Sequence, residues 1–261
     1  MITCGIDVGS ITTKAAVVKD GEVIADKVIF TGYNARKAGE EVFQQIVKSI
    51  GIKPALIEKI ISTGYGRNSV TVADKAITEI TCHAAGAYYL DPMVRSVIDI
   101  GGQDSKAIAV NDTGSPLDFA MNDKCAAGTG RFLEVMAGAL EVDLDNFGDF
   151  SLKAKHPSTI SSLCTVFAES EVISLIAKGE KRENIIAGIH AAIAARVVAM
   201  ANRVGFNTRI MMTGGVAKNI GVVRALERKI GQKIEVSEKS QVTGAIGAAM
   251  IAQRAEGMGF K

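Results

Sequence analysis

Glycine-containing segments that also carry acids, hydroxyls and a lysine recur along the chain, and the first reads DVGSITTK over residues 7–14. Gly9 allows the backbone to approach oxygen atoms closely, and the amides of such a turn form an anion-binding concavity. Lys14 can place a positive charge on a β- or γ-phosphate, and Asp7 can hold Mg²⁺ through water molecules. The segment predicts polyphosphate binding, although a hairpin with a charged rim explains a single loop equally well. The nucleotide-binding residues predicted here are Asp7, Gly9, Ser10, Thr12, Thr13 and Lys14.

A second segment, DIGGQDSK over residues 99–106, repeats this design and adds Gln103 and Asp104. A glutamine can orient an attacking water, as it does in other nucleotide hydrolases, and Asp104 can be a partner of the metal or of that water. We therefore predict an ATPase with Gln103 and Asp104 as its catalytic residues. The nucleotide-binding residues predicted in this segment are Asp99, Gly101, Gly102 and Lys106.

A third glycine turn lies in MTGGVAKN, residues 212–219, between a buried apolar run and the start of a helical pattern. Its predicted nucleotide-binding residues are Gly214, Gly215 and Ala217. None of the three turns is a Walker A loop. Three glycine turns at strand ends, two of them with an acid and a lysine, favour nucleotide binding in a cleft between two lobes over three unconnected hairpins.

Two cysteine motifs follow, NDKCAAGTGRFLE around Cys125 and SSLCTVFAESEVI around Cys164. Each cysteine precedes a predicted helix, and a helix N-terminus favours a thiolate and any anionic group that the thiolate holds. The two cysteines are too far apart in sequence for a local metal knuckle, and spacing alone favours a small buried apolar residue at each position. Gly128 and Gly130, at the start of the next helix, join the predicted nucleotide-binding residues.

Four further residues, one acid, two cysteines and a histidine, have less certain roles in the sequence. Glu171 lies on the helix after Cys164. It is either part of a salt-bridged surface or a carboxylate near the nucleoside, and we include it among the predicted nucleotide-binding residues. Cys4 is predicted in the middle of a core strand. Cys82 is predicted in a packed helix, and its neighbour His83 is predicted to be structural.

The elements that must position these motifs follow a repeated pattern, in which IDVGS and IDIGG stand at corresponding places. Strands are predicted over residues 3–8, 14–19, 22–30 and 59–62, and again over 96–100, 106–110, 117–121 and 209–213. Helices are predicted over residues 38–50, 77–89, 131–140, 168–177, 182–204, 217–230 and 241–256. We predict an α/β fold of two duplicated lobes, residues 1–93 and 94–261, with a nucleotide cleft between them and the last helix packing back on the first lobe.

The composition is that of a globular protein, and the net charge bears on which kinds of partner the chain could bind. Of its 261 residues, 48% are hydrophobic and 22% charged, and the net charge is only +2. That balance favours neither nucleic acid nor an acidic membrane as a partner. The first residues show no leader pattern, and the four cysteines form no CxxC pair. We therefore expect a cytoplasmic protein without disulfides.

The motifs DVGSITTK, TGYGRN, IDIGGQDSK, CAAGTGRFLE, CTVFAESEVIS and MTGGVAKN, in this order along the whole chain, closely resemble the activators of (R)-2-hydroxyacyl-CoA dehydratases. That family includes the activator of 2-hydroxyglutaryl-CoA dehydratase and belongs with the ATPase subunits of benzoyl-CoA reductase. The first loop reads SITTK where relatives often have STASK, which keeps the hydroxyls and Lys14. The resemblance implies an actin-like ATPase (ribonuclease H-like) fold, although the chain is short for actin, Hsp70 or a typical sugar kinase.

The resemblance also implies a function and its cofactors. It implies an oxygen-sensitive homodimer with one [4Fe–4S] cluster between the subunits, for which Cys125 and Cys164 of each chain are the ligands. It further implies use of ATP and Mg²⁺ to drive a low-potential electron to a partner iron–sulfur enzyme, foremost a 2-hydroxyacyl-CoA dehydratase. The electron donor implied is a ferredoxin or a flavodoxin. Because only a short segment separates residues 99–106 from Cys125, we expect nucleotide state to affect the cluster.

Two other functions compete with this one. A small kinase of the actin-like fold, similar to pantothenate or sugar kinases, would share the phosphate loops but has no reason to keep the paired cysteine motifs. A scaffold without turnover fits poorly with Gln103, Asp104 and the two lysines.

Overall fold

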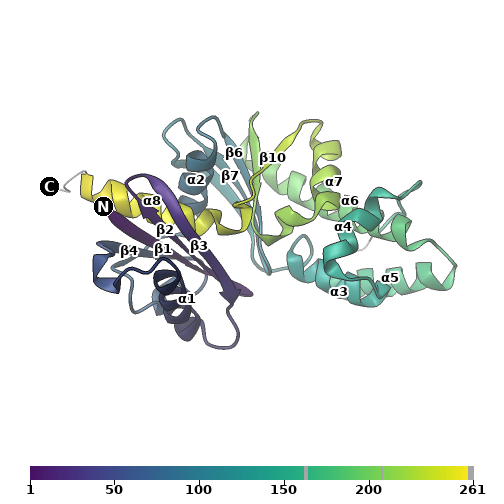
Figure 1. Ribbon diagram of the computed structural model, residues 1–261. Helices are drawn as coiled ribbons and strands as arrows, with labels where there is room; N and C mark the ends of the chain where they lie inside the picture. Colours follow the sequence, from purple (N-terminus) through teal and green to yellow (C-terminus); the bar gives the residue numbers. More distant parts are fainter. Residues whose placement is uncertain (162–163, 207, 258–261) are drawn as a thin grey trace.

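The computed structural model describes residues 1–161, 164–206 and 208–257. Their strands form two five-stranded sheets, which lie in separate parts of the molecule (Figure 1). The first sheet has the strand order β3–β2–β1–β4–β5. Its first three strands form an antiparallel meander, and β1 then pairs parallel with β4, and β4 with β5. The strands are β1 (Ile2–Val8), β2 (Thr12–Lys19), β3 (Glu22–Phe30), β4 (Lys59–Thr63) and β5 (Lys75–Ala76).

The second sheet repeats this topology with the order β10–β9–β6–β7–β8. Its meander is antiparallel, and β6 pairs parallel with β9, and β9 with β10. The internal repeat predicted from the sequence is therefore present as two sheets of the same construction. The strands are β6 (Ser96–Ile100), β7 (Ser105–Val110), β8 (Pro116–Asn122), β9 (Ile210–Thr213) and β10 (Ile234–Val236).

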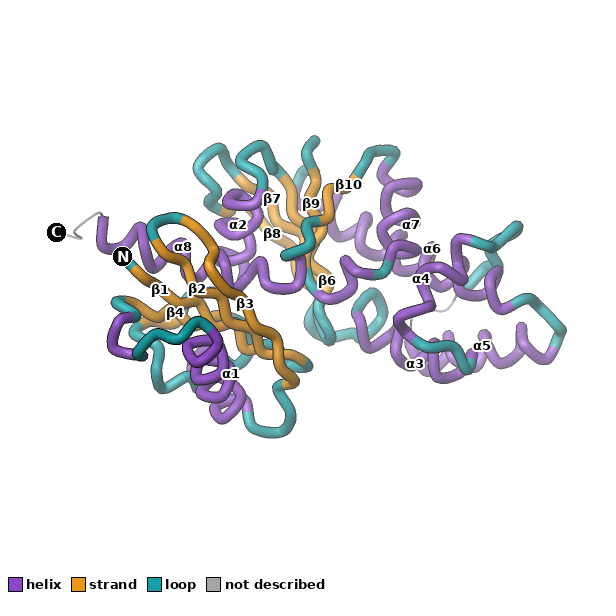
Figure 2. The backbone as a smooth tube through the Cα atoms, in the orientation of Figure 1, coloured by secondary structure: helices purple, strands orange, loops and turns teal. Residues whose placement is uncertain are grey.

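Helices cover the sheets, and three of them extend the second lobe on the side away from the first sheet, where Figure 2 shows α3, α4 and α5 as purple coils. The first five helices are α1 (Ala35–Ser49), α2 (Glu79–Leu90), α3 (Gly130–Leu140), α4 (Leu144–Leu152) and α5 (Thr165–Ala177). The last three are α6 (Arg182–Ala201), α7 (Ile220–Ile230) and α8 (Thr243–Gly257).

Helices α2 and α8 join the two lobes. Helix α2 follows the first sheet in sequence but packs against strands of the second, whereas α8 ends the described chain and packs against β1, β2 and β4. The two helices lie in close contact because Gly247 has no side chain, and a Cβ there would collide with the carbonyl oxygen of Cys82. The hydroxyl of Thr3 also donates to the carbonyl of Ala249 across the α8–β1 contact, at 2.9 Å. The division of the chain at residue 93 stays a prediction.

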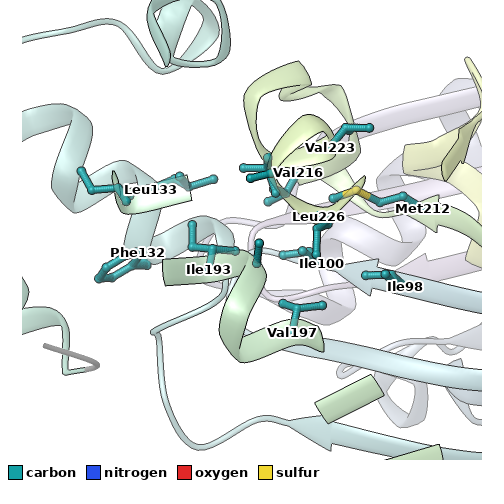
Figure 3. Close-up of a cluster of buried hydrophobic side chains, with 14 of the residues drawn as sticks. Ile98, Ile100, Phe132, Leu133, Ile193, Val197, Met212, Val216, Val223 and Leu226 are labelled. Carbon is teal, nitrogen blue, oxygen red and sulfur yellow. The ribbon is translucent and has the colours of Figure 1, made fainter. Parts of the chain in front are cut away.

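The largest core lies in the second lobe, where side chains of α3, α6 and α7 form one cluster with strands of the second sheet (Figure 3). Ile98 and Ile100 of β6 contribute to it, with Ile193 and Val197 from α6. Helix α6 is long and apolar enough to cross a membrane by composition, but 67% of its apolar window is buried inside the protein. Its apolar residues therefore serve the core of the second lobe.

Most predicted elements match the structure to within a few residues, and the exceptions are short. Strand β5 has two residues and β10 has three, too few for an alternating pattern to show. Helix α4 was not predicted, because its sequence LDNFGDFSL carries a glycine and two aspartates in nine residues. The predicted helix over residues 217–230 begins as a separate 3₁₀ turn, Gly215–Lys218. Helix α7 starts only after Asn219, whose side chain caps it.

Candidate nucleotide cleft and cysteine pair

A cavity of about 950 Å³ lies between the two sheets, and the three glycine turns converge on it. All residues predicted to bind nucleotide or to catalyse its hydrolysis line this cavity except Thr13, Gly128, Glu171 and Ala217. The volume falls within the range of small-molecule sites. Each turn follows an inner strand of its sheet, at the end of the strand that faces the other lobe. The three turns therefore meet in the space between the lobes.

The first turn is held in a defined shape by its own lobe. The amide of Gly9 donates to the carbonyl of Thr12 at 3.1 Å, and the hydroxyl of Thr31 donates to the carbonyl of Gly9 at 2.7 Å. Lys14 donates to Asp7 at 3.3 Å, from the position directly opposite it in the β1–β2 ladder. Thr13 is buried behind the turn, where its hydroxyl meets that of Thr31.

The second turn contains a buried lysine inside a group of carboxylates. Lys106 is 2% exposed, and its Nζ lies 3.1 Å from Asp99, 2.8 Å from Asp104 and 3.5 Å from Glu79. Asp99 and Lys106 stand opposite each other in the β6–β7 ladder, as Asp7 and Lys14 do in the first sheet. Burial alone would lower the pKa of Lys106, but the three carboxylates outweigh burial and raise that pKa.

Asp99 is buried and bound from several sides. Thr213 at the end of β9 donates to its Oδ1 at 2.9 Å, and His83 Nδ1 lies 3.4 Å from the same atom. Burial would raise the pKa of Asp99, yet the charges of His83 and Lys106 and the hydrogen bonds of Lys106 and Thr213 hold it well below its ordinary value. Burial also raises the pKa of Glu79, against the opposing charge of Lys106. The floor of the cleft is thus a buried network of acidic and basic side chains in close contact.

Two residues of this floor were not among the predicted site residues: Glu79, and His83, which was predicted to be structural. Both line the cavity from α2 and are four residues apart, so they lie on one face of that helix. The helical spacing of an acid and a histidine was the available signal, but nothing in the sequence indicates that α2 faces the second sheet. A Cβ atom on Gly244 of α8 would lie 2.9 Å from His83 Nε2 and 3.2 Å from Asp7 Oδ2, so these two side chains meet at this glycine. His83 therefore stands between the acidic residues of both lobes.

The third turn closes the cleft beside α7. Gly214 has a φ of +85°, and a Cβ there would collide with the carbonyl oxygen of Ile100. Its amide donates to the carbonyl of Ser240 at 2.9 Å. Ala217 is buried behind this turn, outside the cavity lining.

The four cysteines divide into two pairs by their surroundings. Cys4 and Cys82 are buried, and burial raises the pKa of each thiol to about 12. Cys125 is half-buried between β8 and α3, and Cys164 is exposed at the N-terminus of α5. Within the described parts of the chain, no group of three or more His, Cys, Asp and Glu residues meets in a way that could hold a metal ion.

Glu171 and Gly128 lie outside the cavity lining, and their predicted roles stay predictions. The carboxylate of Glu171 on α5 accepts hydrogen bonds from the amide and the hydroxyl of Ser161, at 3.0–3.1 Å. Gly128, with a φ of +88°, packs over the side chain of Arg196.

A model of the BadF/BadG/BcrA/BcrD ATPase family matches residues 4–252. The chain belongs to this family. The prediction of an ATPase is thereby confirmed, as is the resemblance to the dehydratase activators and benzoyl-CoA reductase ATPase subunits. The activator of lactoyl-CoA dehydratase from Anaerotignum propionicum is 48% identical to this ATPase over 256 residues, which cover 98% of each chain.

Solved structures agree with this assignment. Component A of (R)-2-hydroxyglutaryl-CoA dehydratase from Acidaminococcus fermentans matches with a TM-score of 0.95 and 45% identity, over 99% of this chain and 100% of that one. The activator of 2-hydroxyisocaproyl-CoA dehydratase from Clostridium difficile, solved with bound ADPNP, has a TM-score of 0.93 and 44% identity, over 98% of this chain and 96% of that one.

A more distant structure shows the fold alone. A ROK family glucokinase from Streptomyces griseus, in complex with glucose and AMPPNP, has a TM-score of 0.62 at 12% identity, over 97% of this chain and 100% of that one. The predicted two-lobed, actin-like α/β fold is confirmed by these matches together with the two duplicated sheets.

Proposed function

We propose that this protein is an ATP-dependent activator that delivers a low-potential electron from a [4Fe–4S] cluster to a partner iron–sulfur enzyme, foremost a 2-hydroxyacyl-CoA dehydratase. The relatives named as dehydratase activators share nearly the full length of the chain. The observation that carries the proposal is a direct connection between the nucleotide cleft and Cys125, which a simple kinase does not need.

That connection consists of two hydrogen bonds at the start of α3. The amide of Gly130 donates to the carbonyl of Gly101 at 2.9 Å, and the amide of Arg131 donates to the carbonyl of Gly102 at 2.8 Å. Gly101 and Gly102 belong to the turn that carries the predicted catalytic residues, and Cys125 lies in the loop just before α3. A shift of the turn on hydrolysis would therefore move the start of α3 and the cysteine loop with it.

The residues of the cleft have separate roles in this proposal. Lys14 neutralises phosphate charge, because it is only partly buried and has a single carboxylate partner at 3.3 Å. Lys106, in contrast, is fully buried and balances three carboxylates. Gln103 orients the attacking water. Asp7 and Asp104 are the residues that would hold Mg²⁺, since both carboxylates line the cavity and oxygen ligands suit that ion.

Cys125 and Cys164 fit a cluster shared by two chains. A [4Fe–4S] cluster takes four thiolates as a rule, and the described chain supplies two thiols that are not deeply buried. A twofold axis through the cluster would supply the other two from a second copy. When bound, the cluster would act as a one-electron donor. The thiolates would hold it, and Cys164 stands at the N-terminus of α5, where the helix dipole favours negative charge.

Helix α5 supports a homodimer. It is apolar on most sides, yet only Ala168 and Val172 on it are buried. Val166 is 65% exposed and Phe167 is 67% exposed, both within three residues of Cys164. An apolar surface beside an exposed cysteine is typical of an interface, and a second copy that shares the cluster would cover it. We further propose a cytoplasmic, oxygen-sensitive protein with ferredoxin or flavodoxin as its electron donor.

The test is ATP-dependent activation of a partner. Anaerobically purified protein, a reductant and Mg-ATP are added to an inactive, oxidised 2-hydroxyacyl-CoA dehydratase, and dehydration of its acyl-CoA substrate is measured. We expect activity only with ATP, and about four iron atoms per dimer of activator. An iron-free protein that converts ATP to ADP while phosphorylating a sugar or pantothenate would overturn the proposal in favour of the kinase.

A further inference from the structure

Asn122, the last residue of β8, holds the loop that carries Cys125. Its side-chain amide donates to the carbonyl of Cys125 at 2.8 Å and to the carbonyl of Ala127 at 3.2 Å. Between these two, the carbonyl of Ala126 accepts from the hydroxyl of Thr129 at 2.6 Å. One asparagine thus fixes both sides of the loop, with both of its amide hydrogens in use.

Asn122 is held in turn by Arg196 of α6. The Nη2 of Arg196 lies 3.5 Å from the Oδ1 of Asn122, and its aliphatic part passes under Gly128, where a Cβ would lie 3.2 Å from the Arg196 Cδ. The Nε of Arg196 is buried and finds no hydrogen-bond partner among the described residues. A buried donor on a cation costs free energy when it has no partner. An anionic group bound at the cysteine loop would offset this cost and explain why the guanidinium of Arg196 lies beside the loop.

The same asparagine also lies next to the catalytic turn. In the β7–β8 ladder Asn122 pairs with Ser105, which directly follows Asp104 in the sequence. At the other end of the cysteine loop, the amide of Gly130 is bonded to the carbonyl of Gly101. Both ends of the loop are therefore tied to the turn that faces the nucleotide.

We propose that Asn122 is a positioning residue for Cys125, and that Arg196 supplies a partly buried positive charge that compensates the thiolate and the anionic group that it holds. The proposal rests on the proposed function, because it takes Cys125 as a cluster ligand. The two residues have separable effects. The amide of Asn122 fixes the loop, whereas the guanidinium of Arg196 stabilises added negative charge and so raises the reduction potential of a bound cluster.

The positioning role is tested without iron, in the full-length cluster-free protein, by amide hydrogen exchange. Asn122→Asp keeps the shape and the oxygen that faces Arg196 but cannot donate to the loop carbonyls. We expect the backbone amides of residues 125–130 to exchange about tenfold faster, the order of effect of losing two hydrogen bonds. The control is Asn111→Asp, at the opposite end of the same hairpin, where the side-chain oxygen only accepts hydrogen bonds and still can. Unchanged exchange in Asn122→Asp would overturn the positioning role.

The charge role is tested by anaerobic redox titration of the iron-containing protein. Arg196→Met should shift the midpoint potential to a more negative value, and Arg196→Lys, which keeps the charge, should restore it. Arg182→Met is the control, because Arg182 lies on the same helix but is exposed beside Glu141. An unchanged potential in Arg196→Met would overturn the charge role. A wild-type protein without iron would overturn the proposed function and the charge role together, and the exchange experiment would still decide whether Asn122 holds the loop.

Discussion

Replacing Lys106 by methionine should destabilise the protein far more than the same replacement at Lys14. The two lysines occupy equivalent places in the two sheets, each opposite an aspartate in an antiparallel ladder. Lys106 is 2% exposed with three carboxylates within 3.5 Å, whereas the side chain of Lys14 is 14% exposed with one carboxylate at 3.3 Å. Methionine has nearly the length of lysine, so the comparison isolates the loss of charge.

The size of the effect follows from the burial of these charges. Removing one partner of a buried ion pair costs about 3–5 kcal/mol, because the remaining charge is left without compensation. The Lys14–Asp7 pair is less buried and has a single carboxylate, so the loss of Lys14 should cost about 1–2 kcal/mol, between the values for exposed and buried pairs. At roughly 2–4 °C per kcal/mol for a chain of this size, Lys106→Met should lower the Tm by about 10 °C and Lys14→Met by about half as much or less.

The pH dependence has a definite sign. In the native protein the pKa of Asp99 is lowered, so its contribution to stability is present above the ordinary carboxyl pKa and is lost as pH falls. Burial raises the pKa of Asp99 and of Glu79, and the charge of Lys106 counteracts it. Without Lys106, the pKa of each carboxyl should therefore rise. The variant should therefore recover part of its deficit as pH falls from 7 towards 5. Thermal unfolding of both variants, followed by circular dichroism at several pH values, measures this. Equal losses for the two lysines at pH 7 would refute the reasoning.

Other substitutions test the remaining parts of the site. Gln103→Ala should lower kcat for ATP hydrolysis by 10²-fold or so with little change in KM, because a residue that orients water acts mainly in the transition state; a steady-state ATPase assay that shows unchanged turnover would remove it from the mechanism. Asp104→Ala should lose most hydrolysis, with the loss partly relieved by raised Mg²⁺ if the carboxylate holds the metal. Cys125→Ser and Cys164→Ser should each abolish iron binding, measured by iron analysis of anaerobic protein, and retention of iron in either would reject that ligand. The matched controls are Cys4→Ser and Cys82→Ser, which should keep it.

Local sequence patterns predicted most strands well, because the residues that define a strand and its turns lie within one short segment. The Asp20-Gly21 pair forms the turn between β2 and β3, with φ of 50° and 89° that suit a hairpin. The repeat of Asp, Gly and Lys in the two sheets predicted two lobes with facing turns, and the duplicated topology follows it. Residues near the glycine turns could therefore be placed in one cleft from the sequence alone.

Such local patterns do not predict contacts between segments that are far apart in the sequence. Glu79 reaches Lys106 because α2 packs on the second sheet, although it follows the first in sequence. The burial of Lys106 follows from that packing, so no local pattern indicates that Lys106 differs from Lys14. Arg196 under the cysteine loop depends in the same way on how α6 lies against β8. These contacts depend on tertiary packing, which periodicity does not specify.

The central claim, that nucleotide state reaches the cysteines, is tested most directly by the rate at which a chelator of Fe²⁺ extracts iron from the anaerobic protein. The rate is compared with saturating Mg-ADP and with Mg²⁺ and a non-hydrolysable ATP analogue. The account predicts faster extraction in the ATP-like state, because the turn bonded to α3 through Gly101 and Gly102 moves the cysteine loop and exposes the iron. Equal extraction rates in both nucleotide states, with unchanged cluster spectra, would contradict it.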